Sequence, residues 1–332
     1  MALLLTLFFT LFKRGFEAQI RFLSKNNNAG RNGMTGAARQ ELIGLIDLYM
    51  EALATGDPGR LPVARGVKFT EQAKEITLGE GLWRKKIGLV PGGQYFADPK
   101  TGGACLFNAI KCDGTDGLIW LRLKAIDGKI AEIETLFIPE NKFMFNAEVA
   151  ARPRAIWQEI IPESERRPRE EMFRIMNLYF EGIERVDGSI IPVADDAFRL
   201  ENGTRASTNP NPPAHLPPYM HTILKEGIAE QLTNRRHTYI QGIRDRRYLL
   251  ADEERGITFG CFLFDQPGRR EDGSPTVTGR STMLIPEAFK IRDGIIRQVE
   301  AVGTALPYGA QSGWTWSFVK EQPPRDVTRG QL

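Results

Sequence analysis

Residues 48–64 read LYMEALATGDPGRLPVA, and residues 178–194 read LYFEGIERVDGSIIPVA. Aligned without a gap, the two stretches share seven identical residues, where about one would be expected by chance. The identical pairs are Leu48/Leu178, Tyr49/Tyr179, Glu51/Glu181, Asp57/Asp187, Pro62/Pro192, Val63/Val193 and Ala64/Ala194. A segment that returns in this way indicates that the chain contains one domain twice.

Two further segments of the first copy recur in the second copy, in the same order. The turn that contains Ala97, Asp98 and Gly102 corresponds to the one that contains Ala251, Asp252 and Gly256. The segment LKAIDGKIAEIE at 123–134 corresponds to FKIRDGIIRQVE at 289–300. We therefore expect one fold used twice, with these boundaries: an N-terminal extension at 1–36, a first domain at 37–149, a linker at 150–167, a second domain at 168–320 and a tail at 321–332.

Each copy is expected to open with an amphipathic helix. Apolar residues recur at helical spacing, and each helix ends at an Asp-Pro-Gly or Asp-Gly-Ser break. The positions are Leu42, Ile46, Tyr49 and Leu53 in the first copy, and Met172, Ile175, Met176, Tyr179 and Ile183 in the second. Short apolar or alternating runs follow and predict strands at 103–110, 118–126, 129–137, 239–251, 257–265, 281–291 and 295–302. This order predicts an α+β fold of two tandem domains, each with its helix packed in a curved antiparallel sheet.

The composition excludes several classes of protein. The net charge is +3 over 332 residues, and basic residues are interleaved with acids, so nucleic-acid binding has no support. Cys105, Cys112 and Cys261 show no CxxC spacing, which argues against a zinc site or a disulfide framework and favours a reducing, cytoplasmic compartment. No GxGxxG, P-loop or HExxH motif is present. We expect neither a cofactor nor a metal.

The first residues form an apolar run, Met1 to Phe12, that ends at Lys13-Arg14. Twelve residues are too few for a membrane-spanning helix, and no signal-peptide cleavage pattern follows. Our expectation is an upstream extension, with the true start near Met34. The alternative is a weak membrane anchor without stable insertion.

The chain resembles the nuclear-transport-factor-2-like, or SnoaL-like, superfamily. The resemblance rests on the L-Y-x-E helix with its following Asp, on the Ala-Asp-x-x-x-Gly turn and on the closing hairpin of 123–134 and 289–300. It implies that each helix lies in a cone made by a bent antiparallel sheet. It also implies cofactor-free acid/base chemistry on a hydrophobic, aromatic compound, because such relatives include isomerases, dehydratases and formaldehyde lyases. Function within one fold remains diverse, so the fold does not decide it.

Two glutamates hold the same place in the closing strands of the two copies. The pairing of the last two strands in each copy depends on the turn between them. A two-residue Asp-Gly loop gives a first register, and a bulge that adds one residue gives a second register. The first register pairs Glu300 with Glu287 and Glu134 with Leu121, and the second pairs Glu134 with Arg122 and Glu300 with Ala288. Two carboxyls in one apolar cavity would raise one pKa and create an acid beside a base. The alternative is that the glutamates face solvent or form ion pairs.

Other candidates stand on the helix, the strands and the loops expected around the second cone. The predicted catalytic residues are Tyr179, His221, Asp245, Glu287 and Glu300, and the predicted substrate-binding residues are Arg244, Tyr239, Trp83 and Arg84. Each has a structural alternative, such as a core tyrosine, a loop histidine, an exterior ion pair, or Trp83 as a plug in the first cone. His215 and His237 are weaker candidates.

We therefore predict a cofactor-independent lyase, dehydratase or isomerase whose second cone binds a hydrophobic, aromatic small molecule. The rival hypothesis is a non-catalytic ligand-binding or assembly module built as an internal pseudo-dimer, with a further homodimer as one form of assembly. The two hypotheses differ in whether titratable groups gather inside the second cone.

Overall fold

The computed structural model describes residues 36–141, 143–270 and 273–314. The predicted N-terminal extension with its apolar run, the suggested start at Met34 and the tail at 321–332 lie outside the described residues. Two helix-and-sheet units follow one another along the chain. We call residues 36–139 the first unit and residues 169–306 the second unit.

The first unit begins with helix α2 (Gly36–Thr55), which is followed by Gly56 in a left-handed conformation. Its remaining elements are η2 (Pro58–Arg60), β1 (Val63–Glu71), β2 (Lys74–Glu75), η3 (Gly81–Arg84), β3 (Ile87–Leu89), β4 (Gln94–Asp98), β5 (Gly103–Cys112), β6 (Thr115–Ile126) and β7 (Lys129–Pro139). The repeated Asp57 caps η2 by accepting a hydrogen bond from the Gly59 amide at 3.0 Å. Asp187 does the same for the Ser189 amide, which explains why both copies keep this residue.

The second unit begins with helix α5 (Arg169–Arg185). Its remaining elements are η5 (Gly188–Ile190), β8 (Val193–Glu201), β9 (Thr204–Arg205), α6 (Pro218–Lys225), α7 (Ile228–Thr233), β10 (Gly242–Asp252), β11 (Ile257–Arg269), β12 (Pro275–Arg292), β13 (Ile295–Ala301) and β14 (Thr304–Leu306). Between the units lie α3 (Ala147–Ala151), α4 (Ala155–Gln158) and η4 (Glu163–Glu165). Helices α6 and α7 have no counterpart in the first unit.

Each unit contains one open sheet. The order is β2-β1-β7-β6-β5-β3 with β4 on β5 in the first unit, and β10-β11-β12-β13-β8-β9 with β14 on β12 in the second. The prediction of an α+β fold, with a helix and a sheet in each of two tandem units, is confirmed. The expected purely antiparallel sheet is not, because β1 pairs with β7 and β8 pairs with β13 in parallel. Strands β1 and β8, the segments just after the repeated helix, were not predicted.

The closing hairpins settle the register. Asp127 and Gly128 have φ values of 49° and 72°, and Asp293 and Gly294 have 54° and 74°, as a two-residue type I′ turn requires. A register shift then follows within three residues of each turn, so the bulge of the second alternative is also present. The resulting pairs are Arg122 with Glu134 and Ala288 with Glu300. The alternative register, with Glu300 opposite Glu287, is therefore wrong.

The face of each sheet that contacts its helix, which we call the inner face, holds that unit's core. In the first unit Tyr49 and Trp83 are 0% and 4% exposed, and their rings meet edge to face at 5.2 Å. In the second unit Tyr179 lies against Phe289 at 5.1 Å. Trp83 thus fills the first cone, as its structural alternative proposed.

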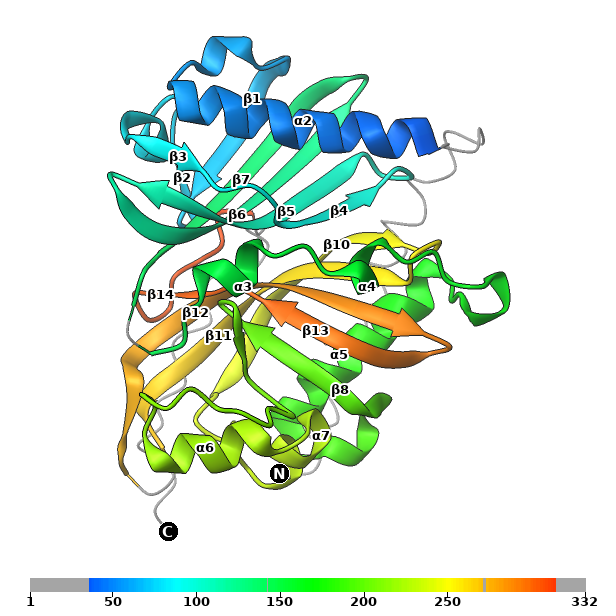
Figure 1. Ribbon diagram of the computed structural model, residues 1–332, viewed down its shortest axis with the longest axis vertical. Helices are drawn as coiled ribbons and strands as arrows, with labels where there is room; N and C mark the ends of the chain where they lie inside the picture. The colour runs from blue at the N-terminus through cyan, green and yellow to red at the C-terminus, as the bar shows by residue number, and fades with distance from the viewer. Residues whose placement is uncertain (1–35, 142, 271–272, 315–332) are drawn as a thin grey trace, which may run out of the picture.

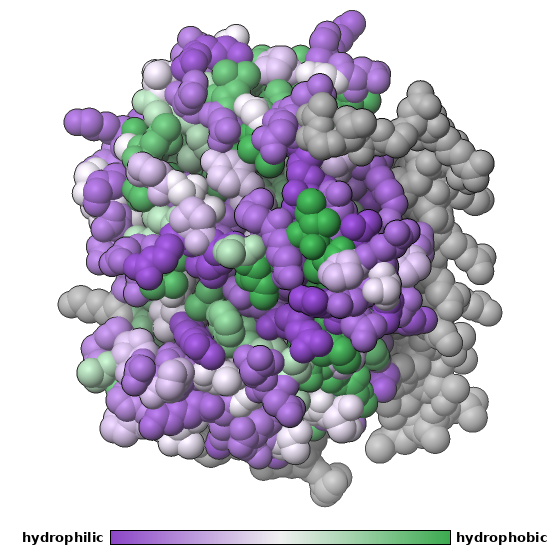
Figure 2. Space-filling view, turned by 45° about the vertical axis from the view of Figure 1, so that its right-hand side comes forward, coloured by the Kyte–Doolittle hydropathy of each residue, from purple (hydrophilic) through white to green (hydrophobic). Residues whose placement is uncertain are grey.

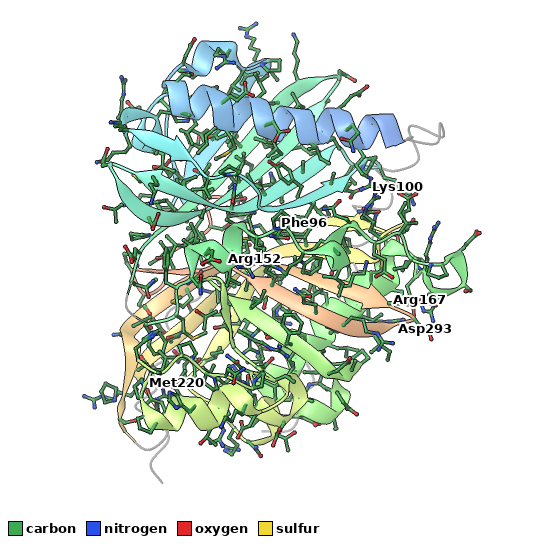
Figure 3. The ribbon with its side chains drawn as sticks, in the orientation of Figure 1. Phe96, Lys100, Arg152, Arg167, Met220 and Asp293 are labelled. Atoms are coloured by element: carbon green, nitrogen blue, oxygen red, sulfur yellow. The ribbon has the colours of Figure 1, made fainter. Side chains whose placement is uncertain are left out.

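The opposite, outer faces of the two sheets pack on each other, so that helix α2 and helices α6 and α7 lie at the two ends of the molecule (Figure 1). Phe259 of β11 stands at the centre of this contact. Its ring lies 5.3 Å from that of Phe96, 5.2 Å from that of Phe107 and 6.2 Å from that of Trp120. Figure 3 shows Phe96 between the two sheets. The burial of these aromatic rings between the two sheets therefore stabilises the contact between the units.

Two equivalent ion pairs cross this contact in opposite directions. Arg39 of the first unit donates to Asp252 of the second at 2.5 and 3.1 Å. Arg169 of the second unit donates to Asp98 of the first at 2.7 and 2.9 Å. Arg39 and Arg169 are equivalent residues of the repeat, as are Asp98 and Asp252. Reciprocal contacts of this kind are those of a two-fold symmetric dimer.

The helix ends of the two units differ at one repeated position. Gly56 and Val186 both have a left-handed conformation, with φ values of 66° and 57°. This conformation costs a residue with a Cβ atom about 1–2 kcal/mol, whereas glycine adopts it freely. Replacing Val186 by Gly should therefore raise the free energy of unfolding by about 1 kcal/mol. Urea denaturation measures this, and Gly56→Val should lower the stability. A loss of stability in both variants would contradict the explanation.

The surface is mixed. On the face shown in Figure 2, small hydrophobic areas are set among hydrophilic residues. Four large hydrophobic residues are exposed among those described, namely Leu89, Ile126, Ile160 and Tyr219. No helix in the described part of the chain has the length and apolar character needed to cross a membrane.

Candidate active site

Two charged side chains occupy inner-face positions of the second sheet that are apolar in the first. Arg199 of β8 stands at the repeat position of Phe69, and Glu287 of β12 stands at that of Leu121. Alternation along a strand puts Glu287 on the same face as Phe289, which packs on Tyr179. Arg199 and Glu287 are each 3% exposed. The second unit therefore holds a buried polar cluster where the first holds only core.

Arg199 is the centre of this cluster. Its Nη1 donates to the Tyr179 hydroxyl at 3.0 Å, and its Nη2 donates to Gln231 Oε1 at 2.9 Å. Its Nε donates to Glu201 at 2.5 Å. These partners come from helix α5, helix α7 and strand β8, so one guanidinium ties together three elements. Because Tyr179 accepts this bond, its own proton is directed elsewhere.

Glu287 has the most perturbed carboxyl of the cluster. Burial raises its pKa to about 8; the positive charge of Arg199 acts against this shift, and the charge of Glu201 adds to it. Its Oε2 is buried and has no hydrogen-bond partner among the described residues. Since such atoms are costly in a native protein, they mark positions where a ligand or water is held. Near neutral pH this carboxyl is mostly protonated yet close to ionising.

His237 follows helix α7 and contacts the same arginine. Arg199 Nη2 lies 3.3 Å from His237 Nε2. Burial of the ring and, next, the charge of Arg199 lower the pKa of His237 to about 3. The guanidinium can only donate, so Nε2 accepts and the proton of the neutral ring resides on Nδ1. That Nδ1 is buried and unpartnered among the described residues. His237 therefore offers a second unused donor.

The structure brings together three of the predicted residues. Tyr179 and Glu287 belong to the cluster, and Tyr239 lies beside it with its ring 6.2 Å from that of His237. Sequence reasoning missed Arg199, Glu201 and Gln231, and it counted His237 among the weaker candidates. Aligning the repeat beyond position 194 would have found Arg199, because the equivalent Phe69 is apolar.

Glu300 lies outside the cluster. The bulge between Ile296 and Gln298 turns Glu300 to the outer face. There the Arg154 guanidinium holds both carboxylate oxygens, and Trp157 Nε1 donates to the carboxylate at 2.9 Å. Glu134 is its equivalent and takes two hydrogen bonds from Arg247 at 2.7 and 3.0 Å. The expectation of an acid pair between Glu300 and Glu287 is therefore wrong. Both glutamates bind arginines at the contact between the units.

The remaining predicted residues of the second unit lie elsewhere. His221, on α6, contacts the Pro213 carbonyl oxygen through Nε2 at 3.1 Å. Arg244 is paired with Asp265 at 2.7 Å. Asp245 lies in β10 at a register shift, with a φ of 50°. None of these contacts involves the residues of the Arg199 cluster.

The predicted binding residues of the first unit are also separated from the cluster. Trp83 is buried beside Tyr49 in the first unit's core. Arg84 is exposed at the end of η3. The structure therefore brings neither of them to the residues around Glu287.

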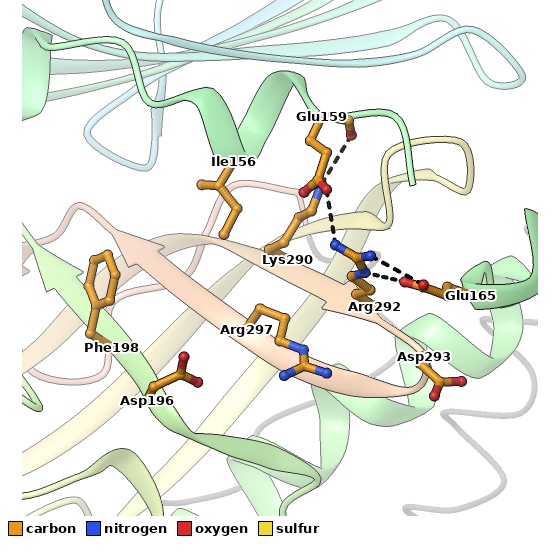
Figure 4. A pocket seen from close by; sticks show the side chains of 9 residues that line it. All are labelled: Ile156, Glu159, Glu165, Asp196, Phe198, Lys290, Arg292, Asp293 and Arg297. Carbon is orange, nitrogen blue, oxygen red and sulfur yellow. Dashed lines mark hydrogen bonds and ion pairs between the residues drawn. The ribbon is translucent and has the colours of Figure 1, made fainter. Parts of the chain in front are cut away.

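A pocket of about 570 Å³ lies on the outer face of the second sheet, below α4 (Figure 4). Lys290 lines it and donates to the carbonyl oxygens of Glu159 and Arg255 at 3.1 and 2.7 Å. Its equivalent Lys124 likewise bonds the Thr101 carbonyl oxygen. Both lysines thus fasten a turn in their own unit, and basic and acidic groups are mixed around the pocket. We do not place the chemistry here.

The described residues contain no set of side chains placed to bind a metal ion. Over residues 36–141, 143–270 and 273–314, no three His, Cys, Asp or Glu side chains are placed to hold a metal ion. The groups that remain available around Glu287 are proton donors and acceptors. The arrangement suits proton transfer and the stabilisation of a negatively charged oxygen.

A comparison with known families matches part of the chain. A family described as a domain of unknown function (DUF8021) matches residues 165–303, which correspond to most of the second unit. No curated protein matches the chain.

Solved structures resemble parts of the chain at low identity. An NTF2-like protein of unknown function from Cytophaga hutchinsonii is 15% identical, covering 32% of this chain and 94% of its own, with a TM-score of 0.25. A proposed ketosteroid isomerase from Kribbella flavida is 13% identical, covering 31% and 82%, with a TM-score of 0.27. A protein of unknown function with a cystatin-like fold from Methylobium petroleophilum is 12% identical, covering 44% and 84%, with a TM-score of 0.27.

Proposed function

We propose that the second unit is a cofactor-independent acid/base enzyme, an isomerase or a lyase, that acts on a hydrophobic, aromatic small molecule. The observation that carries the proposal is the buried Glu287 carboxyl, with a pKa of about 8 and an unpartnered oxygen, inside a sheet whose twin has Leu121 at that place. A catalytic acid or base works best when its pKa lies near the working pH.

The residues of the cluster supply complementary roles. Glu287, when ionised, takes a proton from the carbon beside a carbonyl group of the substrate. Tyr179 donates its hydroxyl proton as a hydrogen bond to the carbonyl oxygen, and Arg199 strengthens that donor through its own bond to the tyrosine oxygen. Glu287 then returns the proton to another carbon in an isomerisation, or to the leaving group in an elimination. Electrons and protons balance without a cofactor.

The first unit takes a structural part in this proposal. Phe69, Leu121 and Trp83 fill its inner face, so it retains Tyr49 without a charged partner like Arg199. The ion pairs of Arg39 and Arg169 hold this unit against the second sheet. One unit thus supports the chemistry of the other.

Proton exchange into a simple ketone tests the proposal without knowledge of the natural substrate. Acetophenone and 1-indanone are incubated with the protein in D₂O, and loss of the protons beside the carbonyl is followed by NMR. The wild-type protein should accelerate the exchange, and Glu287→Gln should reduce it about 100-fold or more. Glu300→Gln, at the equivalent depth on the other face, should leave it unchanged.

The alternative function, a non-catalytic ligand-binding or assembly module, is favoured by the reciprocal ion pairs and by the filled first unit. It predicts the same slow exchange in the wild type and in Glu287→Gln. Circular dichroism shows whether each variant is folded, so that a loss of exchange in a folded Glu287→Gln protein reports on chemistry. Equal rates in the two proteins would contradict the enzymatic proposal.

A further inference from the structure

Two pieces of the second unit are longer than their counterparts in the first, and they meet at one place. The first piece is residues 206–241, which carry α6 and α7 between β9 and β10. The second is the longer β11-β12 hairpin, whose strands have 13 and 18 residues where β5 and β6 have 10 and 12. Helices α6 and α7 lie at the end of the molecule remote from the first unit (Figure 1). Met220 marks α6 in Figure 3.

Arg270, the residue just after β11, connects these two pieces. Its guanidinium carbon lies 5.6 Å from the ring centre of Tyr219 and 5.4 Å from that of Tyr239. Tyr219 is 49% exposed, whereas Tyr239 is only partly exposed. An arginine held against two aromatic rings keeps its planar shape and presents the N–H groups at its edge. These three residues form what we call the arginine entrance.

The arginine entrance is continuous with the Arg199 cluster. The Tyr239 ring lies 6.2 Å from the ring of His237, which in turn contacts Arg199 at 3.3 Å. Burial and the negative charge of Glu201 raise the pKa of Tyr239 to about 12, while Arg199 and Arg270 act against this shift. The charges of both arginines therefore act on the Tyr239 hydroxyl. Contacts between side chains therefore link exposed Tyr219, through Arg270, Tyr239 and His237, to Arg199.

We infer that the arginine entrance recognises the carboxylate of an aromatic substrate, so that Arg270 is a specificity-determining residue. The inference rests on the proposed function, because it assigns a substrate class to the same site. A guanidinium edge matches the two oxygens of a carboxylate, and the flanking rings stack on a planar body. The apolar end of the ligand then points past Tyr239 toward Tyr179 and Glu287.

Calorimetric titration with two matched probes tests the inference. The probes are 2-naphthoate and 2-naphthamide, which share a planar body and differ in charge, and neither has a proton that the proposed reaction removes. The wild-type protein should bind naphthoate about tenfold tighter than naphthamide, or better. Arg270→Gln should remove that preference by weakening naphthoate alone. Arg269→Gln should change neither affinity, because exposed Arg269 bonds only the Gly273 carbonyl oxygen among the described residues.

Three results would overturn the inference. They are no naphthoate binding by the wild type, unchanged naphthoate affinity in Arg270→Gln, and equal losses for both probes, which would indicate a purely structural role of the arginine. The Glu287→Gln protein should still bind naphthoate. Arg270-dependent binding without any ketone exchange in the wild type would therefore refute the catalytic proposal and leave the carboxylate site standing.

Discussion

Replacing Asp98 by Ala is expected to lower the free energy of unfolding by about 3–5 kcal/mol, because it leaves a buried arginine without its counter-charge. Asp98 is 0% exposed and Arg169 is 3% exposed. The lost carboxylate also accepts hydrogen bonds from the Ala251 amide at 3.1 Å and from the Thr101 hydroxyl at 2.8 Å. Since Asp98 and Arg169 belong to different units, the whole molecule should lose stability. Urea denaturation measures the loss.

An exposed ion pair of the same strand region is the control. Asp116 pairs with Lys111 at 2.5 Å, but their side chains are 39% and 55% exposed. Asp116→Asn should therefore cost less than about 1 kcal/mol. Adding Arg169→Met to Asp98→Ala should recover part of the loss, because it removes the stranded charge. Equal small losses for Asp98→Ala and Asp116→Asn would show that the contact between the units does not depend on its ion pairs.

Glu287→Gln is expected to become more stable than the wild type as the pH rises. The pKa of Glu287 is raised from 4.5 to about 8 in the folded protein, so folding takes up a proton between these values. The neutral carboxyl therefore makes its full contribution to the free energy of unfolding below pH 4.5. This contribution is lost as the pH rises through 8. At about 1.4 kcal/mol per pH unit, the wild type should lose about 4 kcal/mol relative to the variant between pH 5 and 8.5.

The difference between the two unfolding curves isolates this carboxyl, because all other groups are shared. Glu140→Gln, at an exposed position just after β7, serves as the matched control and should run parallel to the wild type. Parallel curves for Glu287→Gln as well would mean that Glu287 is ionised in the folded protein at neutral pH, which contradicts a raised pKa at this carboxyl.

Repetition made much of the fold predictable. The identical residues in the two copies predicted two units. The helical spacing of the apolar residues around Tyr49 and around Tyr179 correctly predicted that both tyrosines lie on buried helix faces. The Asp-Gly dipeptides correctly marked the closing turns. Strands β1 and β8 escaped prediction because their partners, β7 and β13, are remote in sequence and run parallel to them. Local patterns carry little information about such pairing.

The site was predictable only in part. Tyr179 and Glu287 could be selected because one is repeated and the other lies in an apolar strand. Glu300 was misplaced because a bulge after the turn, which the sequence does not mark, turns it to the outer face. His237 reaches Arg199 only because helices α6 and α7 carry the chain back over the sheet, a tertiary effect that no local spacing encodes.

Infrared spectroscopy of the Glu287 carboxyl tests the central claim most directly. A spectrum taken at pH 6.5 minus one taken at pH 9.5 should contain a carboxylic-acid C=O band that disappears with a midpoint near pH 8. The band should be absent from Glu287→Gln and present in Glu140→Gln. Identical difference spectra for Glu287→Gln and the wild type would show that Glu287 carries no proton at neutral pH, and the proposed acid/base site would fall.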